Sequence, residues 1–359
     1  MVKKFDRRIF LCIMLLVMAA SLMAWYYFTQ KVNVAKKAAE EVVLHDPLIV
    51  KDSTMNSFQK VTWDCIWFGS YPQTEVKETD SEYELLKSTK DWDSNGDAII
   101  NGTKYRRMLK DDAAYVFFIE SEYYDFYNWE DDTTYHYFRY EPIKWRVLKT
   151  GRSKVMLLSD IILDTRKYSS KCESTTWETC TVRSWLNGYS GDMNQEGIDY
   201  NSGNFIDSAF TDEEKSAISD TVVVNSNSLR YDIEGGNDTI DKLFLLSESE
   251  IYTYNYGFID SFISDEARMC KSSDYAKAMG ACSNKLHYNG NCSWWLRSPG
   301  CDSDCAVCVG SSGDINYRGD VVYSDYTSYG VRVALNLNPY DSNQYTYAGT
   351  VCSEEQLVQ

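Results

Sequence analysis

An apolar run near the start, from Ile9 to Phe28, constrains this chain more than any other feature because it contains no charged side chain. It holds about 20 residues, and a helix of that length spans about 30 Å, the thickness of a bilayer's hydrocarbon core. Basic residues precede the run, and Trp25-Tyr26-Tyr27 ends it as an interfacial aromatic belt would. The sequence therefore predicts an N-terminal signal anchor within residues 1–30, with membrane contact through residues 9–28. A cleaved signal peptide is the alternative, although the best cleavage site, Ala19-Ala20-Ser21, lies inside the run.

The remainder of the chain is expected outside the cytoplasm. An N-terminal hydrophobic segment normally acts as an export signal. The chain has 11 cysteines, and one of them, Cys12, lies in the predicted anchor; the even number that remains suits an oxidising compartment. We therefore predict a single-pass protein of the cell membrane with an extracellular C-terminal domain. Free thiols in a cytosolic domain are the alternative.

The charge of the chain limits its partners. It has 53 acidic and 36 basic residues, for a net charge of -17. A nucleic-acid partner is not expected, because phosphate binding needs a basic footprint. The acidic excess fits solubility or loose binding of divalent cations. No cofactor is predicted, and calcium alone is left open.

The chain divides into four predicted parts. The anchor is followed by a polar juxtamembrane stalk at residues 31–57, with a helical piece from Val34 to Leu44. One extracytoplasmic domain follows at residues 58–340, because no low-complexity linker interrupts it. Residues 341–359 are predicted to be a loose tail, although Tyr347 and Cys352 could pack back onto the domain.

Several apolar stretches predict strands. They are Cys65–Phe68, Pro142–Leu148, Val155–Leu158, Val307–Ile315 and Gly330–Leu337. Residues 97–105 predict a hairpin, because Asn101-Gly102 favours the positive φ angles of a two-residue turn. The preceding Asp91–Asp97 stretch begins like a calcium loop, but position twelve is Gly102 in place of a glutamate, so a turn is predicted.

Helices are expected to be short. Residues 179–187 have one apolar face and Gly188 ends them. Thr211 followed by Glu214 is a capping-box start. Residues 247–254 and 273–279 complete the set. Short helices among short strands predict an α+β fold with a mostly antiparallel sheet and long loops.

Short motifs occur in a characteristic order along the chain. They are Phe68–Gln73, Pro142–Leu148, Leu157–Asp160, Val182–Asn187, Phe244–Ser247, Trp294–Gly300 and Gly330–Leu335. In this order they resemble a family of unknown function in exported Gram-positive bacterial proteins, known by its Trp-Trp-Leu-Arg-Ser-Pro-Gly signature. The resemblance covers residues 60–338. More distantly, that family is similar to the C-type-lectin-like fold of sulfatase-modifying enzymes and phage receptor-binding tips, which implies a lectin-like scaffold.

The chain departs from the active members of that fold. Glu141-Pro142 is followed by Ile143, so the calcium-dependent sugar site of the lectins is not expected. Cys301, Cys305 and Cys308 lie late in the chain, as the reactive cysteines of the formylglycine-generating enzymes do, but without their surrounding pattern. Neither activity is carried over to this chain, because function does not follow from fold.

Candidate ligand-binding residues gather in the last motifs and the loops between them. They are Trp294, Trp295, Arg297, Asp302, Asp304, Asp314 and Arg332. Adjacent residues in a strand point to opposite faces, so one tryptophan is expected in the core and the other could be exposed. A purely structural role for these residues is the alternative.

Two disulfides are predicted, Cys172 with Cys180 and Cys301 with Cys305. Cys305 and Cys308 are poorly placed to pair, because in a strand their Cα atoms would lie about 10 Å apart. Motifs for the common hydrolases, phosphate loops and zinc sites do not occur in the sequence.

Three functions stay open at this point. The first is a cell-surface domain that binds a protein or glycan ligand through its loops. The second is an exported enzyme that uses cysteine chemistry on a sulfatase-modifying-factor-like fold. The third is a structural component of the envelope.

Overall fold

The structure is a computed structural model that describes residues 43–115, 122–171, 174–284, 289–323, 329–338 and 344–357. The predicted anchor, the helical piece of the stalk up to residue 42 and Cys172 lie outside the described residues. Within the described ranges, no helix is long and apolar enough to cross a membrane.

The described helices are short. They are α2 (Tyr83–Ser88), α3 (Thr181–Asn187), α4 (Phe205–Ala209), α5 (Asp212–Ala217), α6 (Glu248–Ile251) and α7 (Asp274–Ala278), with 3₁₀ turns η1 (Lys110–Asp112), η2 (Gly191–Met193), η3 (Tyr254–Tyr256) and η4 (Ser353–Leu357). The strands are β1 (Leu48–Lys51), β2 (Gln59–Val76), β3 (Asp97–Ile100), β4 (Thr103–Met108), β5 (Tyr124–Asp125), β6 (His136–Lys149), β7 (Val155–Ser159), β8 (Asp164–Thr165), β9 (Thr221–Val223), β10 (Thr239–Asp241), β11 (Leu243–Phe244), β12 (Ser283–Asn284), β13 (Asn291–Cys292), β14 (Trp294–Pro299), β15 (Cys305–Val309), β16 (Ile315–Val321), β17 (Gly330–Val331), β18 (Ala334–Leu337) and β19 (Thr346–Cys352).

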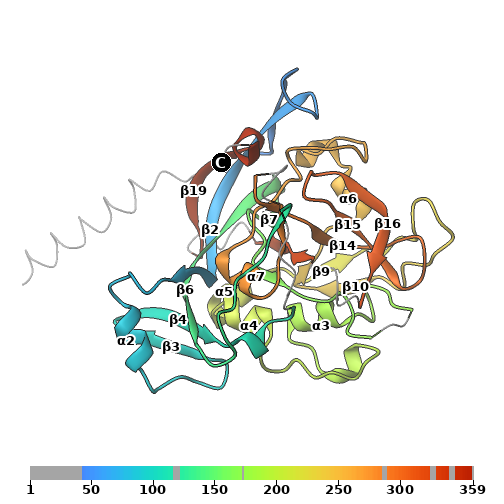
Figure 1. The fold of residues 1–359 in the computed structure, drawn as a ribbon. Coiled ribbons are helices and arrows are strands. Elements are labelled where there is room, and N and C mark those ends of the chain that lie inside the picture. The colour runs from blue at the N-terminus through green and yellow to red at the C-terminus, as the bar shows by residue number, and fades with distance from the viewer. Residues whose placement is uncertain are drawn as a thin grey trace, which may run out of the picture. The chain divides into compact units, whose positions relative to one another are not determined.

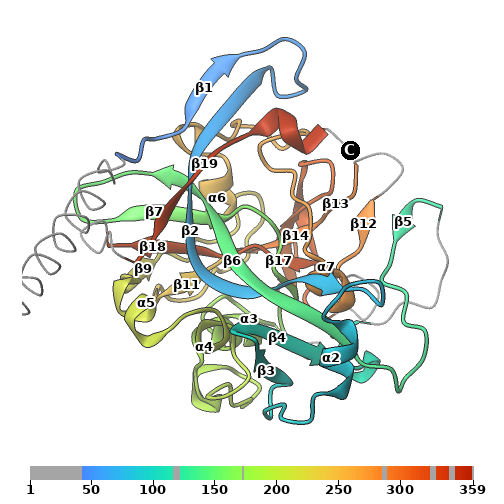
Figure 2. The ribbon, with the colours of Figure 1, turned by 90° about the vertical axis from the view of Figure 1, so that its left-hand side faces the viewer.

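Two long antiparallel strands, β2 and β6, form the centre of the main sheet (Figures 1 and 2). Within the described ranges this sheet has nine strands, in the order β1-β2-β6-β7-β18-β11, with β19 paired to β2 and the β3-β4 hairpin paired to β6. Trp63 and Trp145 are fully buried on opposite faces of this sheet, because Cys65 pairs with Arg146 and Ile66 with Trp145. The mixed α+β class with mostly antiparallel sheets is therefore confirmed.

A bulge at Gly69 bends β2 within the Phe68–Gln73 motif. The register with β6 shifts between Trp67 and Ser70, and Gly69 has a φ of 68°. A Cβ at this glycine would lie 2.5 Å from the Phe210 ring, so no larger residue fits. The bulge places Tyr71 in the buried interior, where it is 1% exposed.

A second sheet of five strands has the order β16-β15-β14-β17-β8, in which β14 and β17 are parallel. Two predicted strands are divided here. The stretch from Val307 to Ile315 forms a hairpin with a turn at Gly310–Gly313, where the Gly310 N–H donates to Asp314. The stretch from Gly330 to Leu337 breaks after β17, and β18 continues in the main sheet. The single strand predicted from residue 330 to residue 337 is therefore two short strands, one in each sheet.

Local predictions that depend on neighbouring residues are confirmed. Asn101 and Gly102 form the two-residue turn between β3 and β4, with φ angles of 52° and 84°. Gly188 ends α3 in the left-handed conformation. Thr211 and Glu214 form the expected capping box of α5.

Both ends of the described chain join the main sheet. β1 lies within the predicted stalk and pairs with Gln59–Thr62 of β2, while β19 lies within the predicted tail and pairs with Thr62–Trp67. The Ser353 hydroxyl of η4 also accepts the Val61 N–H at 3.1 Å. For residues 346–352 the structure shows the alternative, in which Tyr347 and Cys352 pack back onto the domain, because the edge of β2 supplies their backbone partners.

Candidate functional site

The two tryptophans of the Trp294–Gly300 motif are both buried. Trp294 is 0% exposed and Trp295 is 1% exposed. The Trp294 indole N–H donates to the Arg268 carbonyl and that of Trp295 to the Arg166 carbonyl, each at 3.1 Å. The expectation that one of them could be exposed is wrong, because β14 is an inner strand covered on both faces.

The two arginines predicted to bind ligand are also internal. Arg297 donates to the carbonyls of Leu245, at 2.7 Å, and Val224, at 3.1 Å, and to Glu250 at 2.5 Å. Arg332 is 0% exposed and donates to the Ser159 carbonyl at 3.0 Å. Burial lowers the pKa of Arg332 to about 10. The contacts of both side chains hold elements of the fold together.

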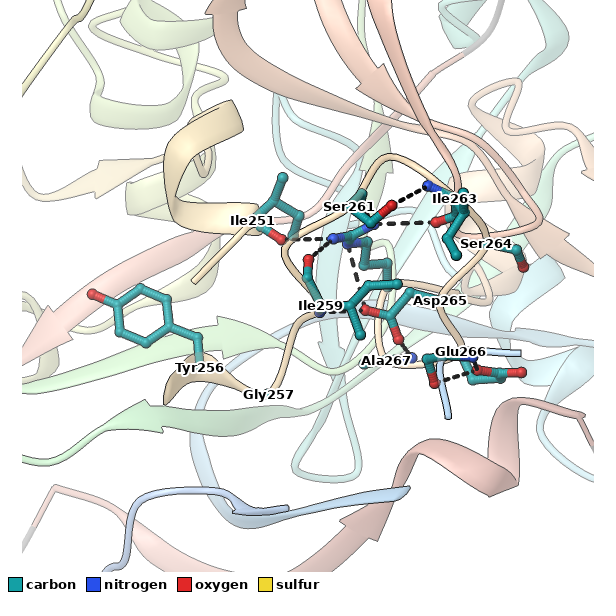
Figure 3. Close-up of polar contacts among 12 residues, drawn as sticks. Ile251, Tyr256, Gly257, Ile259, Ser261, Ile263, Ser264, Asp265, Glu266 and Ala267 are labelled. Atoms are coloured by element: carbon teal, nitrogen blue, oxygen red, sulfur yellow. Dashed lines mark hydrogen bonds and ion pairs between the residues drawn. The ribbon is translucent and has the colours of Figure 1, made fainter. Parts of the chain in front are cut away.

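A third buried arginine, Arg268, contacts the Trp294–Gly300 motif through its backbone. Carbonyl groups of the preceding segment converge on its guanidinium. Figure 3 shows Ile251, Ile259 and Ser261, which carry these carbonyls. The guanidinium donates to Ser261 at 2.7 Å and to Ile251 at 3.1 Å, and also to Ile259, while its Nε lies 3.6 Å from Asp265. The Arg268 carbonyl is the acceptor for Trp294, so this cage positions the motif strand.

The acidic candidates lie in the loops around β15 and β16. Asp302 is exposed, and Asp304 and Asp314 are half-buried. Asp314 accepts a hydrogen bond from Ser312. Across the described ranges, no group of three or more His, Cys, Asp or Glu residues is placed to hold a metal ion.

The described cysteines are free thiols, including Cys180, Cys301 and Cys305. The predicted Cys301–Cys305 bond is therefore absent from the structure, and the partner expected for Cys180 lies outside the described residues. Burial and the neighbouring Asp304 raise the pKa of Cys305 to about 12. A thiol with so high a pKa is a poor nucleophile, which does not favour cysteine chemistry.

A cavity that the sequence did not predict lies elsewhere in the domain. It has a volume of about 310 Å³. We call it the arginine cleft, and it is defined by Tyr71, Arg106, Arg107, Arg166, Trp185, Asn204 and Tyr275, which come from β2, β4, the residue after β8, α3, the N-cap of α4 and α7.

A buried acid lies behind the lining of the arginine cleft. The Tyr71 hydroxyl donates to Asp164 at 2.6 Å. Burial raises the pKa of Asp164, although Arg166 and Tyr71 act in the opposite direction. Trp185, on the buried face of α3, packs edge-on against Phe205 with ring centroids 5.6 Å apart. The side chains behind the lining are therefore buried and partly aromatic.

Arg166 crosses the cleft without a hydrogen bond. Its Nε lies 3.7 Å from Asp164, an ion pair too long for a hydrogen bond. Its guanidinium carbon lies 4.7 Å from the centre of the Trp185 ring, and its side chain is 35% exposed. Among the described residues, no acceptor is hydrogen-bonded to this guanidinium. Stacking thus orients a cation whose donors remain available.

Arg107 has the same character. Its guanidinium carbon lies between two rings, 5.1 Å from the centre of Trp92 and 4.4 Å from that of Tyr135. The residue is half-buried, and its side chain has no hydrogen-bond acceptor in the described ranges. Its neighbour Arg106 differs, because it donates to both oxygens of Asp97 at 2.7 and 2.9 Å. Arg106 therefore braces β4 against β3.

A second cavity of about 330 Å³ shares Tyr135 with the arginine cleft. Its buried member is Glu75, which lies 2.8 Å from Nδ1 of His136 and also accepts from Tyr127 and Lys77. Burial alone would raise the pKa of Glu75, but these hydrogen bonds outweigh it and lower the pKa to about 2. Unlike Arg107 and Arg166, this charge is fully partnered.

The sequence contained only part of the signal for the arginine cleft. Tyr71 and Trp185 belong to motifs that carry the family resemblance, but they were not interpreted as site residues. Arg107 and Arg166 belong to no motif. In the sequence they stand out only as basic residues in a strongly acidic chain. The aromatic residues that they contact come from other segments, so the sequence does not show these contacts.

Comparisons with known proteins give one match. No curated protein and no solved structure is similar to the chain. Residues 152–339 match the model of a domain of unknown function, DUF6273, which contains Arg166, Trp185, Asn204 and Tyr275 of the arginine cleft. Since the match spans more than half of the sequence, this chain belongs to the DUF6273 family.

Proposed function

We propose that this protein is a membrane-anchored, extracellular binding module whose ligand occupies the arginine cleft. Residues 9–28 act as the single-pass anchor, and the folded domain recognises a protein or glycan at the cell surface. The proposal moves the binding site away from the Trp294–Gly300 motif, whose aromatic and basic side chains contact other parts of the same fold.

One observation carries the proposal, namely a cavity lined by two arginines, Arg107 and Arg166, whose guanidinium groups have no hydrogen-bonded acceptor among the described residues. The volume of about 310 Å³ lies in the range of small-ligand sites. Tyr71, Trp185 and Tyr275 are nearly buried and shape the lining, while Arg107 and Arg166 supply planar polar groups. A lining with such donors suits a sugar unit, whose hydroxyl groups accept hydrogen bonds, so a glycan is the favoured ligand.

The scaffold of the proposed module is lectin-like. Support comes from the mixed α+β class and from long loops that join short strands. In such a scaffold, recognition can vary in the loops while the sheets stay constant.

The binding proposal can be tested by filling the cleft. Full-length protein in lipid nanodiscs is applied to glycan and peptide arrays. Ser208 on α4 lines the cleft, so Ser208→Trp should abolish binding. Ser216 is exposed on the neighbouring helix α5, and Ser216→Trp is the matched control. An array without any bound ligand, or binding that survives Ser208→Trp, would overturn the proposal.

The orientation needs its own test. Protease added outside intact cells should release the domain from the membrane, leaving a short fragment that contains residues 9–28. Full protection from the protease would contradict an extracellular domain.

A further inference from the structure

We infer that the ligand of the arginine cleft carries an anionic group, a carboxylate or a phosphate, held between Arg107 and Arg166. This inference rests on the proposed binding function and specifies the chemistry of the ligand. It begins with the two guanidinium groups that line the same cavity and lack a hydrogen-bonded acceptor among the described residues.

The two guanidiniums are held in place without using their donors. Arg166 stacks on Trp185 at 4.7 Å, and Arg107 lies between Trp92 and Tyr135. A guanidinium that contacts a ring face uses none of its N–H groups in that contact, so these donors can still reach an acceptor. An arginine oriented in this way loses little conformational entropy when it binds an anion.

Elsewhere in the domain, buried arginines are partnered by protein oxygens. Arg106, in the same cavity, has Asp97, and Arg297 has two carbonyls and Glu250. The fold therefore supplies acceptors where an arginine is structural. Their scarcity at Arg107 and Arg166 points to an acceptor that comes from outside the chain.

The two aspartates that line the cleft, Asp93 and Asp112, do not pair with these arginines. Asp93 directs one carboxylate oxygen to the backbone N–H groups of Asn95 and Asp97, at 2.8 and 2.9 Å. Asp112 directs one to the N–H of Leu109 at 2.7 Å. Both carboxylates therefore shape their own loops, and the cleft offers more donors than acceptors to a ligand.

The cleft places cations in a strongly acidic chain. Its charged lining consists of three arginines and two aspartates, whereas the whole chain has a net charge of -17. Behind this lining, Asp97 pairs with Arg106 and Asp164 lies 3.7 Å from Arg166, while Arg107 has no acidic partner in the described ranges. An anionic group in the cleft would therefore gain most from Arg107 and from the donors of Arg166 that have no hydrogen-bonded acceptor.

The experiment compares matched sugars by isothermal titration calorimetry on full-length protein in nanodiscs. The probes are glucuronic acid, glucose 6-phosphate and glucose. At least one acidic sugar should bind about 10-fold more tightly than glucose, because a hydrogen bond to a charged group contributes about 1.5–3 kcal/mol. The acidic sugar that is preferred tells a carboxylate ligand from a phosphate ligand.

Variants assign the preference to the two arginines. Arg107→Gln and Arg166→Gln should each reduce it, and the double variant should remove it. The exposed Arg152 provides the matched control, and Arg152→Gln should leave the preference unchanged. Melting temperature and circular dichroism of each variant separate lost binding from lost folding.

The outcomes distinguish this inference from the proposed function. If glucose binds as tightly as both acidic sugars, or if array ligands that Ser208→Trp blocks are all neutral, the anionic inference is wrong and the binding function stands. A preference that survives in the double variant places the anion elsewhere and also overturns the inference. If neither the arrays nor the acidic sugars give binding, both proposals fail.

Discussion

Arg297 and Arg107 lie in two regions of one domain, and they differ in what their guanidinium groups contact. Arg297, in the motif strand β14, donates to two backbone carbonyls and to Glu250. Arg107, in the arginine cleft, contacts two aromatic rings and no hydrogen-bond acceptor in the described ranges. Arg297, which belongs to a sequence motif, thus has a structural role. Arg107, which belongs to no motif, has donors that a ligand could use.

The difference has an energetic basis. A buried guanidinium must recover the hydration it loses, and carbonyl and carboxylate oxygens of the fold do this for Arg297. A half-exposed guanidinium such as Arg107 keeps part of its hydration, so the fold does not need to partner it. Substitutions in the two regions should therefore separate stability from binding.

The largest effect is expected for Arg297→Met. This variant leaves the Leu245 and Val224 carbonyls and the Glu250 carboxylate without their donor, and we expect a loss of about 3–5 kcal/mol in the free energy of unfolding. Urea unfolding followed by tryptophan fluorescence measures it. A loss below about 1 kcal/mol would remove the distinction between the two regions.

Glu75, in the neighbouring cavity, is an acid whose charge is partnered by the fold, as that of Arg297 is. The pKa of Glu75 is lowered from 4.5 to about 2 in the folded protein. A group whose folded pKa is depressed stabilises the fold above its unfolded pKa, so its contribution is complete above about pH 5. It is lost as the pH falls toward 2, and amounts to roughly 3 kcal/mol.

Unfolding curves between pH 2 and pH 6 test this contribution. Glu75→Gln should flatten the acid dependence, while Glu213→Gln, at an exposed position on α5, should leave it unchanged. An unchanged acid limb in Glu75→Gln would show that other groups dominate.

Gly69→Ala should alter the cleft without touching an arginine. The new Cβ meets the Phe210 ring at 2.5 Å at a φ of 68°, and we expect a cost of about 1–3 kcal/mol. Tyr71 would move relative to Asp164, so ligand affinity should fall together with stability. Thermal unfolding and titration calorimetry on the same sample give both quantities. Normal affinity would show that the bulge does not position the cleft.

The smallest effect on stability is expected for Arg107→Gln. Its guanidinium makes stacking contacts alone among the described residues, so we expect a change of at most about 1 kcal/mol in the free energy of unfolding. Binding of an acidic sugar should nevertheless weaken. A loss as large as that of Arg297→Met would show that Arg107 is a structural residue as well.

The sequence by itself determined the features that depend on near neighbours. The Asn101-Gly102 turn, the Gly188 helix end and the Thr211 capping box each involve residues a few positions apart. The mixed α+β class followed from the same local signals.

Only the tertiary structure decided which residues are enclosed and which line the cleft. Trp295 is buried because other strands and loops cover both faces of β14, and β19 is ordered because β2 has a free edge. The arginine cleft joins Tyr71 to Trp185 and Tyr275, far apart in the chain. Such proximity depends on strand pairing and packing between distant segments, which the local pattern of apolar and polar residues does not reveal.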